Sequence, residues 1–447
     1  TAEDIRAMRR DRGFGGGPGG FGYGGRGGPR QQEAIASRFD ADGDGKLNDK
    51  ERNAARQYIQ ETRGSSSPRL RSECLRLSGR TSPFTDLQSD LMASRADAPY
   101  GTPELYDEKT LRTLYLRFHT PDWYEELGDF YRTDVDVPAD LIVDGVVYPS
   151  VGVHFRGSSS YFTIQDSEKK SLNISIDHDN TDERLYGYRT LNLLNSHSDP
   201  SFLREVLYSR ICRQYIPAPK ANFVKLVING ENWGIYVNVQ QFNRDFLQEW
   251  FGTKDGVRWK VPPGRESGLV YVGKDPADYQ GAYQLQTKDA KQAWADLIRL
   301  CETLAQTSDD QLEAALKPIF NIDEALWEIA LENVFIDSDG YISRGSDYDL
   351  YQDPQGRFHL IPRDNNETFR YAGGGGPNSW ESDGPMLSPV AQAHDETRPV
   401  ISRLLAIPHL RARYLAHLRT IVNNRLDWGV LSSIIEEYRS LIDAEVK

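Results

Sequence analysis

The sequence predicts an α+β protein with a short helical segment near its N-terminus. From about Leu105 onward, strand and hairpin patterns come first and helical patterns follow, which is an order typical of α+β domains. Before that region, the stretch "FDADGDGKLNDKE" at residues 39–51 places acidic residues at alternate positions between two helical patterns. Hydrophobic residues make up 38% of the chain and aromatic residues 11%, so the composition is that of an ordinary globular protein.

Charge and cysteine content exclude several classes of protein. The chain has 447 residues and a net charge of −13, which argues against general nucleic-acid binding and is compatible with cation binding. The cysteines, Cys74, Cys212 and Cys301, are too few and too far apart for a disulfide framework or a zinc site. No apolar run is long enough to span a bilayer, so we expect no membrane span.

Changes in composition divide the chain into segments. Residues 13–30 are a Gly-rich linker that cannot bury enough apolar area to order itself. Residues 31–63 hold the acidic loop and its flanking helices. Residues 64–104 are dotted with Ser, Arg and Pro and are interpreted as a second linker, with one helix near residues 84–92, so we expect little coupling between residues 31–63 and the larger domain. Residues 105–447 form the larger domain.

The acidic loop matches the EF-hand pattern for calcium binding when it is numbered from Asp40. Ca²⁺ prefers six to eight oxygen ligands, and an EF-hand supplies them from side chains at positions 1, 3, 5 and 12 and from the carbonyl at position 7. Gly45 at position 6 permits the sharp turn, and Leu47 at position 8 points inward. The predicted Ca²⁺ ligands are Asp40, Asp42, Asp44, the carbonyl of Lys46, and Glu51. The alternative is an acidic turn that binds no ion.

EF-hands usually occur in pairs, and the first residues of the chain resemble the end of a second loop. Thr1 to Asp4 fit positions 9 to 12 of an earlier loop, and "IRAMRRDRG" fits its exit helix, which makes residues 1–12 the expected tail of a truncated EF-hand. This interpretation treats the chain as a fragment. A related hypothesis is a dockerin-like adhesion module, because dockerins carry two Asp-rich loops.

Two hairpins and several apolar helices are expected in the larger domain. Asn229-Gly230 favours positive φ between two alternating strands. Residues 353–356 form the turn of a second hairpin, which brings Asp347 and Asp364 to the same open end. Asp339 follows an apolar helix at residues 325–336, and further helical stripes lie at residues 288–305 and 430–443. Carboxylates gathered at one hairpin mouth repel each other, and a divalent metal carrying phosphates would relieve that repulsion.

Five motifs of the larger domain resemble the CotH family, the spore-coat-protein-H type of atypical protein kinase. They are "VGVHFRGSSS" followed by "KKSLNISID", "LNLLNSHSDPSFLREVLYSRI", "FVKLVINGENWGIYVNVQQF", "DGYISRGSDYDLY" and "HLIPRDNNETF", in that order. The resemblance covers the chain from about Leu105 to its end. It implies a protein-kinase-like fold, binding of ATP with Mg²⁺ or Mn²⁺, and phosphorylation of Ser or Thr in a protein substrate. An extracytoplasmic or cell-surface location is also expected.

The order of the chemical groups parallels that in phosphoryl-transfer kinases. Asp339 is the predicted catalytic base, Asp364 the main metal ligand and Asp347 the second ligand. Lys170 is predicted to contact phosphate, with Lys169 as its rival. The remaining predicted cofactor contacts are Arg156 on phosphate, Glu205 as the partner of the lysine, and Gln240 near the adenine.

The sequence also departs from the family pattern at four positions of the expected site. Asp347 stands where the family has Asn, Arg363 where it has Trp, Asn366 where it has a second Asp, and Gln240 where it has Glu. These departures support a second hypothesis, a catalytically inactive pseudokinase that acts as a calcium-bound surface or coat protein. Retention of Lys170, Asp339 and Asp364 favours the active kinase.

Overall fold

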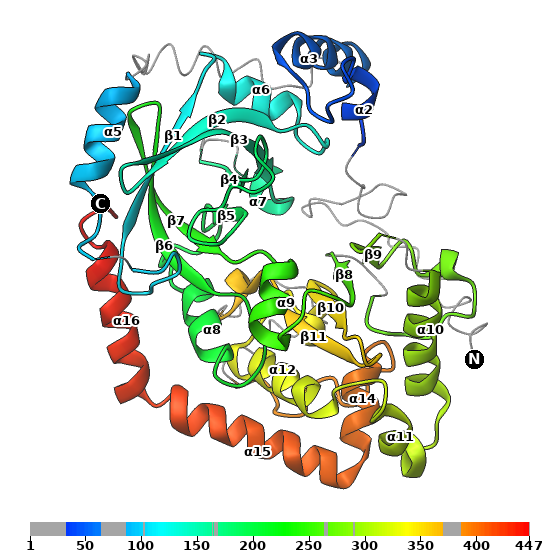
Figure 1. Cartoon of the computed structure of the whole chain (residues 1–447). Coiled ribbons are helices and arrows are strands. Elements are labelled where there is room, and N and C mark those ends of the chain that lie inside the picture. Colours follow the sequence, from blue (N-terminus) through cyan, green and yellow to red (C-terminus); the bar gives the residue numbers. More distant parts are fainter. Residues whose placement is uncertain are drawn as a thin grey trace, which may run out of the picture. The chain divides into compact units, whose positions relative to one another are not determined.

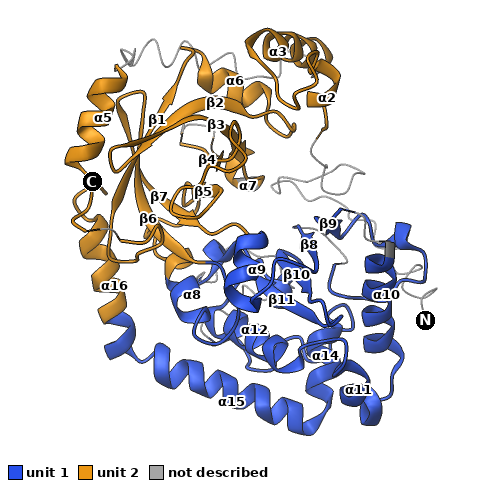
Figure 2. Ribbon diagram, viewed as in Figure 1, with its two compact units in different colours: residues 1–30, 207–219, 242–432 blue, residues 31–206, 220–241, 433–447 orange. Residues whose placement is uncertain are grey.

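The computed structural model has two compact units (Figure 2). The described part of unit 1 comprises residues within 207–219 and 242–432, and that of unit 2 comprises residues within 31–206, 220–241 and 433–447. The predicted segments at residues 1–12 and 13–30 and Cys74 lie outside the described residues. The structure describes residues 33–63, 86–101, 103–162, 164, 169–262, 267–288, 291–369 and 386–446.

Unit 2 is built on a closed, seven-stranded barrel (Figure 1). The strand order is β1-β2-β3-β4-β5-β7-β6, and the parallel pairing of β1 with β6 closes the barrel so that neither strand is left as an open edge. The other neighbouring pairs are antiparallel. The strands are β1 (Arg112–Phe118), β2 (Val137–Val143), β3 (Val146–Arg156), β4 (Ser171–Ser175), β5 (Thr190–Leu194), β6 (Ala221–Ile228) and β7 (Glu231–Val239).

The β6–β7 hairpin is the one predicted from Asn229-Gly230. Asn229 has φ of 48° and Gly230 has φ of 81°, so both central residues of the turn adopt the left-handed conformation that a two-residue hairpin loop requires. The Asn229 side chain also accepts a hydrogen bond from the Phe118 amide at 2.8 Å, which ties the turn to the end of β1.

Short helices surround the barrel of unit 2. Apolar side chains of α5 (Leu87–Ala96), among them Leu91, pack against the barrel residue Ile142. This helix corresponds to the one expected near residues 84–92, but it is part of unit 2 and not part of a linker. The other helices are α2 (Ala36–Phe39), α3 (Asp49–Arg63), α6 (Trp123–Asp129) and α7 (Ser159–Phe162). Two further helices, α8 (Arg204–Cys212) and α16 (Trp428–Ile442), are each divided by the boundary between the units.

The N-terminal helical segment also belongs to unit 2. Ile35, Leu47, Ala55 and Ile59 are buried in the same apolar cluster as the strands of the barrel. The composition of residues 64–104 led us to expect little coupling between this segment and the larger domain. The structure corrects that expectation, because the apolar face of α3 is covered by unit 2 itself.

Unit 1 combines helices with a four-stranded antiparallel sheet of order β11-β10-β8-β9. Its strands are β8 (Val257–Val261), β9 (Gln284–Leu285), β10 (Tyr348–Gln352) and β11 (Phe358–Pro362). Its helices are α9 (Arg244–Phe251), α10 (Lys291–Gln306), α11 (Asp309–Leu316), α12 (Ile322–Phe335), α13 (Tyr341–Arg344), α14 (Pro399–Ala406) and α15 (Pro408–Arg425). The mixed helix-and-sheet class is therefore as predicted, and α10, α12 and α16 correspond to the predicted helices.

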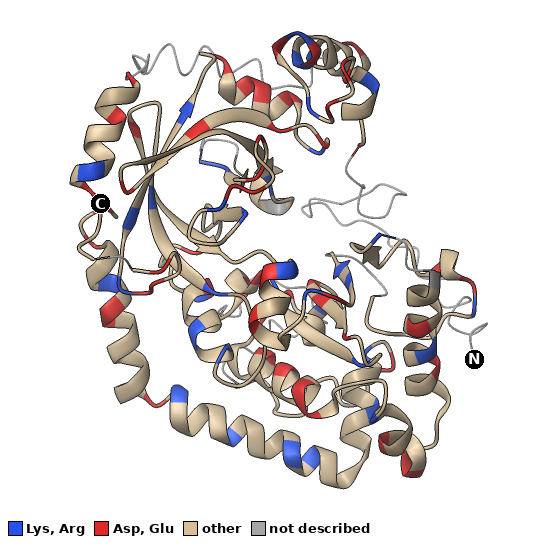
Figure 3. Ribbon diagram, viewed as in Figure 1, with Lys and Arg blue, Asp and Glu red and all other residues tan. Residues whose placement is uncertain are grey.

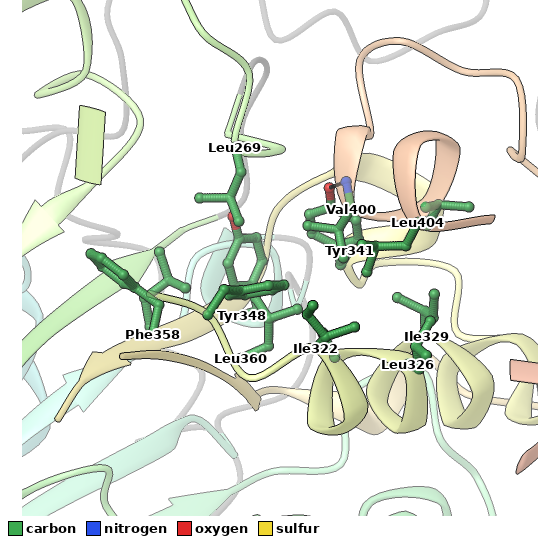
Figure 4. Close-up of a cluster of buried hydrophobic side chains, with 14 of the residues drawn as sticks. Leu269, Ile322, Leu326, Ile329, Tyr341, Tyr348, Phe358, Leu360, Val400 and Leu404 are labelled. Atoms are coloured by element: carbon green, nitrogen blue, oxygen red, sulfur yellow. Dashed lines mark hydrogen bonds between the residues drawn. The ribbon is translucent and has the colours of Figure 1, made fainter. Parts of the chain in front are cut away.

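Helix α12 lies at the centre of the core of unit 1 (Figure 4). Its Ile322, Leu326 and Ile329 belong to one buried cluster with Tyr348 and Leu360 of the sheet. Tyr341 joins the cluster from α13, and its hydroxyl accepts a hydrogen bond from the Val400 amide at 3.1 Å. No helix in the described residues is both long enough and apolar enough to cross a membrane.

The β10–β11 hairpin has its turn at the predicted residues. Tyr348 pairs with Pro362 and Gln352 with Phe358. Asp353 begins the turn, and its side chain accepts hydrogen bonds from the amides of Gln355 and Arg357 at 2.9 and 2.8 Å. The open end of this hairpin therefore carries the residues just before β10 and just after β11, which are Asp347 and Asp364.

Candidate functional sites

The acidic loop, residues 40–51, brings its first three carboxylates close together. One carboxylate oxygen from each of Asp40, Asp42 and Asp44 lies within 4.8 Å of the other two. The Asp40 oxygens accept hydrogen bonds from the amides of Gly43 and Gly45 at 2.7 and 2.9 Å. Gly45 has φ of 85°, a conformation that glycine adopts without steric cost.

Glu51, at the twelfth position, folds back over the acidic loop from the first turn of α3. Its two oxygens accept hydrogen bonds from the amides of Ala41 and Asn48 at 2.8 and 2.9 Å. Its carboxylate is thereby held toward the loop, with lone pairs left on both oxygens. This donor set consists of hard oxygens, which is the chemistry that Ca²⁺ prefers, so the residues fit the predicted ion.

A second group of carboxylates forms in unit 1 at the open end of the β10–β11 hairpin. Asp347 directly precedes β10, Asp364 follows β11, and Asp339 lies between α12 and α13. Asp347 and Asp364 have φ of 58° and 57°, so both are non-glycine residues in the left-handed region. Such strain costs about 1–3 kcal/mol per residue and is concentrated at functional sites.

The electrostatics of unit 1 show that these three carboxylates act on one another. Burial raises the pKa of Asp339 to about 7; the Arg344 charge opposes this shift, and the charges of Glu367 and Asp364 add to it. Burial also raises the pKa of Asp347 well above its ordinary value, against the effect of Arg363 and with the added repulsion of Asp364 and Asp339. These charges place Asp339, Asp347 and Asp364 near one another, as the hairpin argument predicted, but among the described residues only Asp40, Asp42 and Asp44 have carboxylate oxygens that all lie within 4.8 Å of one another.

Two arginines balance part of this negative charge. Arg344 lies 2.5 Å from Asp339 (Nη1 to Oδ1) and 3.7 Å from Glu367 (Nη2 to Oε2). Arg363 lies 3.5 Å from Asp347 (Nη1 to Oδ1). Sequence reasoning noted Arg363 only as a departure and missed Arg344 and Glu367. The position of Glu367, three residues after Asp364, was a signal for the acid, but no local pattern indicated Arg344.

The predicted phosphate contacts Arg156 and Lys170 lie in unit 2. Arg156 ends β3 and pairs with Ser171, so Lys170 is adjacent to it at the same end of the β3–β4 pair. The Lys170 ammonium is buried, donates hydrogen bonds to the carbonyls of Tyr161 and Ile164 at 2.5 and 3.1 Å, and lies 4.6 Å from the Tyr161 ring centroid.

Lys169, the rival of Lys170, has a different environment. Its ammonium donates a hydrogen bond to the Ile235 carbonyl and lies 4.6 Å from the centroid of the Tyr236 ring. Burial lowers its pKa to about 8. Both ammonium groups are therefore bonded to backbone carbonyls, and the choice of Lys170 over Lys169 as the phosphate contact remains a prediction from the sequence.

The last two predicted residues are also in unit 2. Glu205 is buried in the first turn of α8. Gln240 is buried beyond the end of β7. Its side-chain oxygen accepts a hydrogen bond from the Lys220 backbone amide at 3.1 Å, and the Gln240 backbone amide donates one to the Lys220 carbonyl at 2.8 Å. The side-chain oxygen of Gln240 is thus used to join the β6–β7 pair.

Comparison with known proteins identifies the family that carries these features. Residues 153–447 match the family model described as CotH kinase protein, so the chain belongs to the CotH family. It is similar to the inner spore coat protein H-like protein of Bacillus subtilis (strain 168), with 24% identity over 273 residues, 61% of this chain and 72% of that protein. It is also similar to inner spore coat protein H of the same strain, with 30% identity over 135 residues, 30% of this chain and 35% of that protein.

Proposed function

We propose that the chain transfers phosphate from ATP to Ser or Thr of a protein substrate, with Mg²⁺ or Mn²⁺ as cofactor. The observation that carries the proposal is the group of Asp339, Asp347 and Asp364 in unit 1, of which Asp347 is buried and the other two are half-buried, and whose charges repel. A group of this kind, with little contact with water, binds a divalent cation favourably because the cation removes the repulsion. Membership in the CotH family supports the same reaction class.

Each carboxylate has a distinct role in this proposal. Asp364 and Asp347 would hold the metal, which when bound neutralises phosphate charge. Asp339 would orient the acceptor hydroxyl and take its proton, and a pKa of about 7 suits that task because it lies near the working pH. Lys170 and Arg156 would contact phosphate oxygens, with Glu205 supporting the lysine and Gln240 near the adenine.

Two substitutions separate metal binding from chemistry. Asp364→Ala is expected to abolish the metal-dependent thermal stabilisation by ATP, whereas Asp339→Asn keeps most of that stabilisation and loses phosphate transfer, because orienting the hydroxyl matters most in the transition state. Asp310→Ala, which changes an exposed acid of α11, serves as the control. Equal ATP stabilisation in wild type and Asp364→Ala would show that the metal site is wrongly assigned.

A non-catalytic role is the second candidate, and the position of Arg363 favours it. Its guanidinium already lies 3.5 Å from Asp347 and so occupies part of the space that faces a metal ligand. In this role the chain is a pseudokinase that acts as a surface or coat protein outside the cytoplasm, a location consistent with the names of its spore coat relatives. A purified chain that gains no thermal stability from ATP with either metal would support this role over the kinase.

We also propose that the acidic loop is an EF-hand that binds Ca²⁺ through Asp40, Asp42, Asp44, the Lys46 carbonyl and Glu51. The closeness of three carboxylates and the inward position of Glu51 support it. Calorimetry should show calcium binding that Glu51→Gln weakens strongly, because the substitution removes a bidentate ligand. Glu61→Gln, the same change at an exposed position of α3, should bind calcium like the wild type.

A further inference from the structure

The acidic loop is attached to the barrel at its inward residue. Leu47 occupies the position through which EF-hands usually contact a partner, and here it is buried in the apolar cluster of unit 2. A cavity of about 220 Å³ lies beside it and is lined by Asp44, Lys46, Asp136 and His178, among others. The Lys46 ammonium donates a hydrogen bond to the Asp179 carbonyl at 2.9 Å, so the loop contacts unit 2 through its seventh and eighth residues.

The chain entering the acidic loop is fixed to residues 131–134, which we call the bridging segment. The Asp134 carboxylate accepts hydrogen bonds from the amides of Ile35 and Ala36 at 2.7 and 2.9 Å. The Glu33 amide donates to the Arg132 carbonyl at 2.9 Å, and the Asp134 amide donates to the Glu33 carbonyl at 3.2 Å. Movement of the entering chain therefore moves the bridging segment.

The helix leaving the acidic loop is fixed just before the same segment. Arg52 of α3 pairs with Glu126 of α6 at 3.0 Å, and both side chains are buried. Arg56 pairs with Asp129, the last residue of α6, at 2.6 Å. Figure 3 shows the ribbon of α6, with its acidic positions in red, beside α3. Since α6 leads directly into the bridging segment, both ends of the acidic loop are attached to one short stretch of chain.

The other side of the bridging segment contacts Gly157 and Ser158, which follow the predicted phosphate contact Arg156 and which we call, with it, the phosphate-binding loop. The Tyr131 hydroxyl donates a hydrogen bond to the Gly157 carbonyl at 2.5 Å, and the Arg132 guanidinium donates to the Ser158 hydroxyl at 3.0 Å. The Tyr131 and Tyr161 rings stack with centroids 3.6 Å apart. Tyr161 in turn offers its carbonyl to the Lys170 ammonium.

We infer that Ca²⁺ binding at the acidic loop raises the affinity of the protein for nucleotide through the bridging segment. In sensor EF-hand proteins, calcium binding changes the relation of the entering and leaving helices. In this protein the entering chain is tied to the bridging segment that holds Gly157 and Ser158, and the leaving helix α3 is tied to α6 just before it. Bound calcium therefore fixes the phosphate-binding loop before nucleotide arrives. A loop that is already ordered loses less conformational entropy on binding, which makes the coupling positive. The inference rests on the proposed function.

Reciprocal binding measurements test the coupling directly. Calorimetry on the full chain would give the affinity for a non-hydrolysable ATP analogue with Mg²⁺, with and without saturating Ca²⁺, and the affinity for Ca²⁺ with and without the analogue. Thermodynamic linkage requires that Ca²⁺ change the affinity for the analogue by the same factor as the analogue changes the affinity for Ca²⁺. We expect this factor to be about fivefold or more. Glu51→Gln should remove the calcium effect on nucleotide, and Glu61→Gln should keep it. A calcium effect on nucleotide affinity that persists in Glu51→Gln would reveal Ca²⁺ acting at the carboxylates of unit 1.

Two further variants probe the bridging segment itself. Arg132→Asn removes the bond to Ser158 and suits the backbone, because Arg132 has φ of 64° and asparagine tolerates that region. Tyr131→Phe is milder, since it removes only the hydroxyl and keeps the ring stack. Both should bind Ca²⁺ in the absence of nucleotide like the wild type and show a coupling factor closer to one.

The outcomes separate the inference from the proposed function. A protein that binds both ligands with independent affinities refutes the coupling and leaves the proposed function intact. A protein that fails to bind calcium or nucleotide refutes the proposed function and the inference with it. Full coupling in both bridging-segment variants would show that the connection does not run through Tyr131 and Arg132.

Discussion

Replacement of Arg52 by methionine is the sharpest test of how the N-terminal segment is held in unit 2. The side chains of Arg52 and Glu126 are 8% and 7% exposed and lie 3.0 Å apart. Arg52 also donates a hydrogen bond to the Leu47 carbonyl at 3.0 Å. Removal of the arginine leaves a buried carboxylate without its charge partner, and such losses cost about 3–5 kcal/mol.

The assay is urea unfolding of the calcium-free full chain, combined with hydrogen exchange of peptides from α6 and β3. Arg52→Met is expected to lower the free energy of unfolding of unit 2 by about 3–5 kcal/mol and to speed exchange in those peptides. The double variant Arg52→Met, Glu126→Gln should recover part of the loss, because no buried charge is then left unpaired. Methionine and glutamine approximate the volumes of the original side chains.

Arg439→Met is the matched control. Arg439 pairs with Glu436 on α16, but both side chains are mostly exposed, so this change should cost less than about 1 kcal/mol. If Arg52→Met destabilises the protein no more than Arg439→Met does, the segment is only tethered to the barrel. The physical basis for the coupling of calcium and nucleotide would then be lost as well.

The other predictions concern pH, the metal cluster and a turn. Burial raises the pKa of Glu332 from 4.5 to about 8 and that of Glu328 well above its ordinary value. Between these pH values the folded chain keeps protons that the unfolded chain releases. The free energy of unfolding should therefore fall as pH rises from about 4.5 to about 8, by up to about 1.4 kcal/mol per pH unit for each proton. Glu328→Gln should flatten that fall in denaturation curves, and parallel profiles would contradict it. Arg363→Met should lower the melting temperature without metal and enlarge the rise caused by Mg²⁺ or Mn²⁺; a smaller rise would show that Arg363 does not oppose metal binding. Asn229→Ala should cost about 1–3 kcal/mol in urea unfolding because it leaves the buried Phe118 amide unpaired, whereas a neutral change would show that the turn is not held by this bond.

Local patterns were sufficient for the features that depend on neighbours in sequence. The two-residue turn at Asn229-Gly230 and the turn at Asp353 to Gly356 follow from side-chain size and backbone preference alone. From the second turn, the pairing of strands placed Asp347 near Asp364 without any knowledge of the rest of the fold. The family likewise followed from ordered motifs, while a kinase-like fold remains a prediction.

Features that depend on distant contacts were not predictable from local patterns. The composition of residues 64–104 suggested a linker, but α5 lies against the barrel because apolar residues far along the chain cover it. Arg344 next to Asp339 and Glu367 had no local signal, since an ion pair between loops leaves no periodic trace. The same holds for the bridging segment, which joins residues about 100 positions apart.

The sequence by itself determined the α+β class, both hairpin turns, the oxygen-rich pattern of the acidic loop and membership in the CotH family. Each depends on side-chain chemistry or backbone preference over a few residues, or on the order of short motifs. Tertiary structure alone decided how buried each carboxylate is, which arginines face it and what covers Leu47. Desolvation and charge balance depend on all atoms around a group, wherever they lie in the chain, and these effects set the pKa of Asp339 and attach the acidic loop to the barrel.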